Sequence, residues 1–184
     1  MISRAFAKVL CEGLQDACFA RRLLSRMGVS KHEIHVESNP RGAGSGEQFV
    51  REHYPEELTA QRERQARRRA ILVVITDADT RTVAVTRQQL AEQLALRDLP
   101  ARSDVDAVAV LIPRRNIETW LHALEGTTVD ETTAYPKRRG RESDCQTAVD
   151  RLLALLPGDT TKAQPPSLAE ALRELKPLIA LLRT

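Results

Sequence analysis

Carboxylate side chains follow three apolar segments of this sequence, and two of them come directly after the most hydrophobic segment. They are Glu12 after residues 5–11, Asp77 and Asp79 after residues 71–75, and Glu118 beyond residues 105–112. Carboxylate oxygens are the ligands that Mg²⁺ and similar hard cations prefer. Acids crowded together without a cation would raise one another's pKa values and destabilise the fold. The spacing of Asp77 and Asp79 therefore predicts a divalent-metal site, at which the two carboxylates converge once the chain turns.

Each of these acids also has an ordinary structural explanation. Asp77 and Asp79 could be loop and helix-cap residues, since a D-x-D pair is a short motif. Glu12 could be a first-turn helix acid that the helix dipole favours. Glu118 could lie on a helix surface, with the nearby Trp120 simply part of the core. The metal-site interpretation depends on the acids occurring together at separate strand ends.

The elements that would position these acids alternate between strands and helices. Strands are expected at residues 5–11, 34–37, 71–75 and 105–112, and helices at 14–27, 47–69 with an interruption near Pro55, 87–99, 116–124, 147–156 and 167–182. This alternation predicts an α/β fold with a mainly parallel sheet of about four strands flanked by helices. In such sheets ligands bind outside the carboxyl ends of the strands, where the acids are expected. Residues 1–126 form the expected α/β domain, and residues 127–184 a basic loop and a C-terminal helical pair packed on it.

The composition narrows the classes of partner. Aromatic residues make up only 3% of the 184 residues, which argues against a stacking platform for single-stranded nucleic acid. Basic residues gather at 62–69 and 137–141, where they could contact phosphates or could be a solvated helix face and a basic loop. The three cysteines show no CxxC spacing, which indicates reduced thiols in a cytoplasmic protein. No apolar run approaches the roughly 18 residues of a membrane span, so no membrane association is expected.

At its acidic segments the chain resembles a TOPRIM domain, the metal-dependent module of topoisomerases, bacterial primases and OLD-type nucleases. In that family one strand delivers a Glu-Gly pair and a later strand delivers a D-x-D motif, which Val9-Leu10-Cys11-Glu12-Gly13 and Asp77-Ala78-Asp79 match. More narrowly, the chain resembles small stand-alone TOPRIM-like proteins of bacteria and archaea, some of which are encoded near defence genes. The matching features are Glu12, Gly13 and Asp16, the Gly-rich segment 41–46 with Gly44, and the segment 117–121 with Glu118 and Trp120. The resemblance covers roughly residues 5–124 and implies a TOPRIM or Rossmann-like sheet.

The resemblance also implies roles for individual side chains. Glu12 would be the general acid/base or a metal ligand, Asp77 and Asp79 would hold Mg²⁺ or Mn²⁺, and Glu118 would complete the site or hold a second cation. Guanidinium groups suit phosphate, and the candidates for such contacts are Arg41, Arg81, Arg114 and Arg115. The supporting residues would be Gly13, Asp16, Gly44 and Trp120.

Three functions stay open at this point. The first is metal-dependent phosphodiester hydrolysis by a nuclease-like protein that acts on DNA or RNA, in anti-phage defence or DNA processing. The second is a non-catalytic regulatory or interaction subunit that partners a separately encoded ATPase. The third is a phosphatase of the haloacid-dehalogenase type with Asp77 as nucleophile, although Arg81 stands where that family has Thr or Val. A homodimer could form through apolar residues near the C-terminus, namely Leu178, Ile179, Leu181 and Leu182.

Overall fold

The computed structural model describes residues 5–40 and 42–183 and contains one sheet. Its strands are β1 (Phe6–Cys11), β2 (Ile34–Ser38), β3 (Ala70–Ile75) and β4 (Val108–Leu111). They lie in the order β2-β1-β3-β4, and every neighbouring pair is parallel. The predicted α/β fold with four strands is therefore confirmed, and its sheet is parallel throughout.

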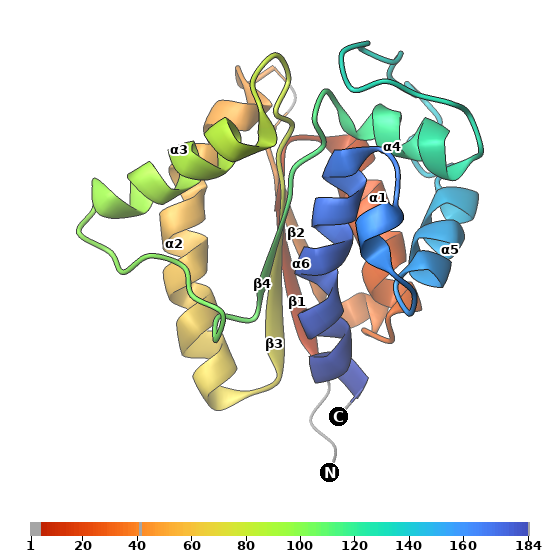
Figure 1. The fold of residues 1–184 in the computed structure, drawn as a ribbon. Coiled ribbons are helices and arrows are strands. Elements are labelled where there is room, and N and C mark those ends of the chain that lie inside the picture. The colour runs from red at the N-terminus through yellow and green to blue at the C-terminus, as the bar shows by residue number, and fades with distance from the viewer. Residues whose placement is uncertain (1–4, 41, 184) are drawn as a thin grey trace.

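Helices cover both faces of the sheet, as Figure 1 shows. The α-helices are α1 (Leu14–Arg26), α2 (Gly46–Arg67), α3 (Val83–Ala95), α4 (Ile117–Leu124), α5 (Gln146–Leu155) and α6 (Pro166–Arg183), and the 3₁₀ helices are η1 (Lys31–Glu33) and η2 (Thr160–Lys162). Helices α2 and α3 lie on one face, whereas α1, α4, α5 and α6 lie on the other. None of the helices in the described residues has the length and apolar character needed to cross a membrane.

Strand β3 explains why the sheet needs a helical layer on each side. All six of its residues are buried, and successive side chains of a strand point to opposite faces. Leu72 and Val74 pack with residues of α2 and α3, while Val73 and Ile75 pack in the core shared with α1, α4, α5 and α6. An unbroken apolar run of this kind is typical of a parallel strand that is covered on both faces.

Helix α2 differs from the sequence-based expectation because it runs through Pro55 without a break. The predicted interruption there was wrong. Proline inside a helix removes one backbone hydrogen bond and costs about 3 kcal/mol. Tyr54 and Leu58 are buried against the sheet on either side of Pro55, so tertiary packing offsets that cost.

Two other boundaries also differ from the prediction. Helix α3 begins at Val83 rather than at residue 87, because Thr82 caps it by accepting a hydrogen bond from the backbone N–H of Val85 at 3.1 Å. Strand β4 begins only at Val108, since Val105 is 82% exposed and lies in the preceding loop. Apolar character alone therefore placed the start of this strand too early.

The strand order fixes where a ligand can approach the sheet. After β1 the chain crosses to β2 on one side, and it then returns to place β3 on the other side of β1. Ligands of open parallel sheets bind beyond the carboxyl ends of the strands at such a switch point. The register pairs Cys11 with Ile75, so the residues that follow β1 and β3 emerge side by side.

Candidate functional site

Four carboxylates gather at this switch point, and we call them the acidic cluster. The acidic cluster consists of Glu12 after β1, Asp16 in the first turn of α1, Asp77 after β3, and Glu118 in the first turn of α4. The charges of the other three members each raise the pKa of Asp77, after burial as the largest cause. Two strand ends and two helix starts thus deliver acids to one place, as the sequence predicted for Glu12 and Asp77.

Glu12 is held by the chain that follows β3. Its Oε1 accepts hydrogen bonds from the hydroxyl of Thr76 and from the backbone N–H of Asp77, both at 2.7 Å. The start of α2 packs on the same side chain, because a Cβ atom added to Gly46 would lie 2.7 Å from the Cβ of Glu12. Burial raises the pKa of Glu12, while the two hydrogen bonds act in the opposite direction. Glu12 is therefore a fixed and partly desolvated carboxylate rather than a mobile surface acid.

Asp16 and Asp77 each have one oxygen that the protein leaves unsatisfied. Asp16 is 5% exposed, and its Oδ2 accepts a hydrogen bond from the backbone N–H of Gly13 at 3.1 Å. The Oδ1 atoms of Asp16 and Asp77 are both buried without a hydrogen-bond partner in the described residues. Burial, followed by the charges of Glu12 and Glu118, raises the pKa of Asp16 to about 8. Because unpaired buried carboxylate oxygens are costly, these two atoms indicate a bound proton or cation.

Glu118 completes the acidic cluster from the far side of the sheet edge. It is 2% exposed, and burial raises its pKa. Its own backbone N–H at the start of α4 and the nearby Lys137 partly offset that rise. The alternative of a surface position for Glu118 is thus wrong, whereas Trp120 is a core residue whose Nε1 donates to the hydroxyl of Ser167 at 2.8 Å.

A basic loop, residues 127–145, brings the side chain of Lys137 close to the acidic cluster. Lys137 of this loop lowers the pKa values of all four acids of the cluster. The loop is anchored on each side of Lys137, because the Asn116 side chain donates to the carbonyl of Tyr135 at 2.8 Å and Gln15 donates to the carbonyl of Glu142 at 2.9 Å. The sequence showed a basic run here but gave no sign of which residue approaches the acids. That information depends on how the loop folds back over α1 and α4.

Asp79 occupies a different position from its predicted partner Asp77. Its side chain is 69% exposed, its φ is +54°, and it pairs with Arg115 at 3.3 Å. The D-x-D spacing therefore directs one carboxylate into the acidic cluster and the other toward solvent. A residue with positive φ turns the chain sharply, which separates the two side chains.

The predicted phosphate-binding arginines lie around the same edge. Arg81 pairs with Glu47 at 3.4 Å, and Arg115 pairs with Asp79. Arg81 and Arg115 each keep a buried Nε atom that has no hydrogen-bond partner in the described residues. Arg114 is half-buried in the segment between β4 and α4, and Arg41 falls outside the described residues.

The supporting glycines act through the backbone. Gly13 supplies the N–H that Asp16 accepts, immediately before α1. Gly44 has a φ of +87°, and its carbonyl accepts a hydrogen bond from Asn39 at 3.1 Å, which closes the loop before α2. The same loop places Gly46 against Glu12. Gly46 is the residue of this segment that the sequence did not single out, since the need for a missing Cβ appears only once α2 and β1 are packed.

No family model, no curated protein and no solved structure matches this chain.

The acidic cluster has the donor chemistry of a site for a hard cation. Within residues 5–40 and 42–183, no group of three or more His, Cys, Asp or Glu side chains lies close enough together to hold a metal ion as the side chains stand. The cluster does supply oxygen donors only, and two of these are the buried, unsatisfied Oδ1 atoms of Asp16 and Asp77. Mg²⁺ prefers such oxygens and keeps several waters, so a few carboxylates suffice to hold it. The donor types, though not yet the spacing of the side chains, thus match a cation of the Mg²⁺ or Mn²⁺ type.

Proposed function

We propose that the acidic cluster binds Mg²⁺ or Mn²⁺ and that the protein is a metal-dependent phosphodiesterase, a nuclease-like protein with a TOPRIM-type site. One observation carries this proposal. Two buried carboxylate oxygens, Oδ1 of Asp16 and Oδ1 of Asp77, lack partners beside two further acids at the switch point of the sheet. Protein interiors tolerate such a group of acids at a functional site more readily than as a structural element.

The residues divide into a cation-holding set and a proton-transfer residue. Asp16, Asp77 and Glu118 would hold the cation, because their charges are mutually destabilising without one. When bound, such a cation activates water and offsets negative charge on the scissile phosphate. Glu12 has its Oε1 fixed by Thr76 and Asp77, which leaves Oε2 to accept or donate a proton. Burial raises the pKa of Glu12, and a raised pKa helps a carboxyl group to donate a proton as well as accept one.

The basic residues around the acidic cluster support a phosphate-containing substrate. Lys137 already counteracts the charge of the acids, and a phosphodiester could pair with it once a cation is present. Arg81 and Arg115 each lie on the rim with one acidic partner and a spare buried Nε. Guanidinium groups with free donors are well suited to phosphate oxygens. We therefore propose nucleic acid as the substrate, with anti-phage defence or DNA processing as the setting.

The other two functions receive less support from this geometry. A phosphatase of the haloacid-dehalogenase type would have Thr or Val where Arg81 stands, and here the guanidinium of Arg81 pairs with Glu47 at 3.4 Å. A regulatory subunit that partners an ATPase would keep the fold without cleaving a phosphodiester. It would also have no evident need for unsatisfied acids at the switch point.

The test is Mn²⁺-dependent cleavage of plasmid DNA and of single-stranded RNA. Wild-type protein should cleave at least one of them in the presence of Mn²⁺ and neither in EDTA. Asp77→Asn and Glu12→Gln should lower the rate by at least about a hundredfold, as expected for loss of a cation ligand or a general acid/base. Asp98→Asn is the matched control, because Asp98 is exposed on the loop after α3 and should leave the rate unchanged. Equal cleavage by the wild type and both variants would refute the proposal, and Mn²⁺ binding without cleavage would favour the regulatory subunit.

A further inference from the structure

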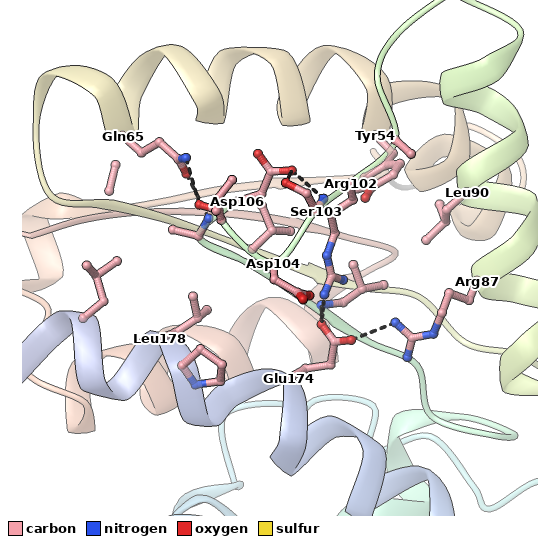
Figure 2. A pocket seen from close by; sticks show the side chains of 18 of the residues that line it. Tyr54, Gln65, Arg87, Leu90, Arg102, Ser103, Asp104, Asp106, Glu174 and Leu178 are labelled. Carbon is pink, nitrogen blue, oxygen red and sulfur yellow. Dashed lines mark hydrogen bonds and ion pairs between the residues drawn. The ribbon is translucent and has the colours of Figure 1, made fainter.

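A large cavity lies away from the acidic cluster, along the outer edge of β4. It has a volume of about 1090 Å³ and opens between α2 and α3 on one side and α6 on the other, as Figure 2 shows. Apolar side chains form much of its wall, including Leu90, Leu94 and Leu178. Val105 at its border is the most exposed of the large apolar residues described. Apolar walls around a few converging polar groups are typical of ligand sites.

The floor of this cavity is the unpaired edge of the sheet. Strand β4 pairs with β3 on one side only, and bonding directions alternate along a strand. Val108 and Val110 therefore turn their backbone N–H and C=O groups away from β3, and both residues line the cavity. The N–H of Val108 already donates to the carbonyl of Asp106 at 2.7 Å, so Val108 offers its C=O to another strand. Such an edge is a template for another strand unless the protein covers it.

Here a carboxylate covers the edge in place of a strand. Oε2 of Glu174, on α6, accepts a hydrogen bond from the backbone N–H of Val110 at 3.0 Å. Arg87 donates to Oε1 of Glu174 at 2.8 Å, and Arg102 lies 2.8 Å from Oε2. Figure 2 shows the two guanidinium groups approaching Glu174 from different directions. An acidic side chain thus stands where the carbonyl of a neighbouring strand would accept a hydrogen bond.

The charges of the lining favour an acidic occupant. Five arginines line the cavity, namely Arg68, Arg69, Arg87, Arg102 and Arg173, against the four acids Asp104, Asp106, Glu170 and Glu174. Asp106 is bound by Arg62, which lies outside the lining. If Glu174 moves aside, Arg102 and the backbone N–H of Val110 lose this acceptor, and Arg87 keeps only Glu170, at 3.6 Å. That arrangement is complementary to a second carboxylate on an extended chain.

We propose that this cavity is a docking site for an extended acidic peptide segment of a partner protein. The segment would add to the outer edge of β4 and place a carboxylate between Arg87 and Arg102, displacing Glu174. Main-chain hydrogen bonds to Val108 and Val110 would supply affinity for many sequences, and the carboxylate would supply selectivity. The site is separate from the acidic cluster, so the proposal does not depend on metal binding or catalysis.

The test uses a pool of end-blocked pentapeptides with a fixed central Glu and Val, Thr, Ser or Ala at the other positions. A second pool carries Gln in the centre, and propionate serves as a carboxylate without a backbone. Binding is followed by the backbone amide NMR signals of Val108 and Val110 in the full chain. The protein variants are Glu174→Ala, which removes the carboxylate that Arg87 and Arg102 share, and Glu170→Ala, which removes the 3.6 Å partner of Arg87 but leaves Glu174 in place as the competitor.

The Glu pool should shift both amide signals. Removal of the internal competitor in Glu174→Ala should tighten its binding by about tenfold relative to wild type and to Glu170→Ala. The Gln pool should bind at least about tenfold more weakly, and Arg102→Gln in the Glu174→Ala background should abolish the preference for Glu. If a spectrum shows that Glu174→Ala is unfolded, Glu174→Gln serves instead, since it keeps the side-chain shape. Absence of any shift in folded Glu174→Ala, or equal affinity for propionate and peptide, would overturn the proposal of strand addition.

Discussion

The acidic cluster and the β4 cavity both contain buried or half-buried carboxylates, but the two regions differ in how these carboxylates are paired. In the cavity, Asp106 accepts hydrogen bonds from Arg62 at 2.9 and 2.8 Å and from the backbone N–H of Ser103 at 2.8 Å. The bond from Arg62 is the largest cause that lowers the pKa of Asp106. In the acidic cluster, burial and neighbouring acids raise the pKa of Asp16 to about 8. In the cavity, Asp106 is paired with groups of the same chain. In the acidic cluster, the Oδ1 atoms of Asp16 and Asp77 have no partner among the described residues.

This difference indicates which carboxylates maintain the fold and which are held for a ligand. A carboxylate with a lowered pKa stabilises the folded state at neutral pH, whereas one with a raised pKa destabilises it. Asp106 fixes the loop before β4 onto α2, so its function is structural. Burial and neighbouring charges raise the pKa values of Asp16 and Asp77, so these acids destabilise the fold at neutral pH, a cost that the proposed cation would offset.

The largest effect on stability is expected from removing the side chain of Asp106, which is fully paired within the chain. Asp106→Ala leaves Arg62 without its acceptor and frees the Ser103 N–H, and it should lower the free energy of unfolding by about 3 kcal/mol. Urea denaturation at pH 7 measures this change. Asp104→Ala, two residues away in an exposed position, should change stability by less than about 0.5 kcal/mol. Equal effects of the two variants would remove the structural role assigned to Asp106.

The acidic cluster should respond in the opposite direction. The folded state binds a proton at Asp16 more tightly than the unfolded state does, because its pKa is raised to about 8. The free energy of unfolding of the metal-free protein should therefore fall as pH rises from about 4 to about 8 and then level off. Asp16→Asn resembles the protonated form and should be more stable than the wild type at pH 8 by about 1–2 kcal/mol. Urea titrations at pH 5 and pH 8 in EDTA check this, and a wild type that is more stable at pH 8 would contradict it.

A third prediction concerns the close approach of α2 to Glu12. The Cβ of Gly46→Ala would lie 2.7 Å from the Cβ of Glu12, and backbone has to move to relieve this contact. The substitution should cost about 1 kcal/mol of stability and weaken Mn²⁺ binding, because Glu12 shifts relative to Asp77. Gly158→Ala is the matched control, since its nearest contact of 3.6 Å is ordinary packing. Thermal melts with and without Mn²⁺ separate the two variants, and unchanged Mn²⁺ binding in Gly46→Ala would argue against a role for this contact.

The smallest effect is expected at Asp79. Its exposed pair with Arg115 should contribute little, so Asp79→Asn should change stability by less than about 0.5 kcal/mol. A larger loss of stability in urea denaturation would mean that Asp79 makes a stronger interaction than its pair with Arg115. The contrast with Asp77, two residues earlier, makes this variant useful as a control for the acidic cluster.

Much of the fold followed from the sequence because hydrophobic patterns report which faces are buried. The run from Ile71 to Ile75 predicted a strand covered on both faces, and β3 is such a strand. The sequence could not show that packing carries α2 through Pro55, since the compensating contacts of Tyr54 and Leu58 are made with distant strands.

The candidate site was predictable in part for the same reason. Glu12 and Asp77 follow neighbouring strands whose register brings them together. This proximity is expected because residues that follow parallel strands meet at the carboxyl edge of the sheet. The separation of Asp79 from Asp77 depends on a positive φ, which residue types do not reveal for an aspartate. The approach of Lys137 depends on a loop that is anchored by single hydrogen bonds to α1 and to the residue before α4.

The most direct test of a cation site is calorimetric titration of the metal-free protein with Mn²⁺ at pH 8.5, where Asp16 is largely ionised. Wild type and Asp79→Asn should each bind one Mn²⁺ with similar affinity. Asp77→Asn should bind it at least about a hundredfold more weakly, because one of the two buried Oδ1 atoms that lack a partner belongs to Asp77. No binding by the wild type, or equal binding by the wild type and Asp77→Asn, would contradict the assignment of the acidic cluster as a divalent-metal site.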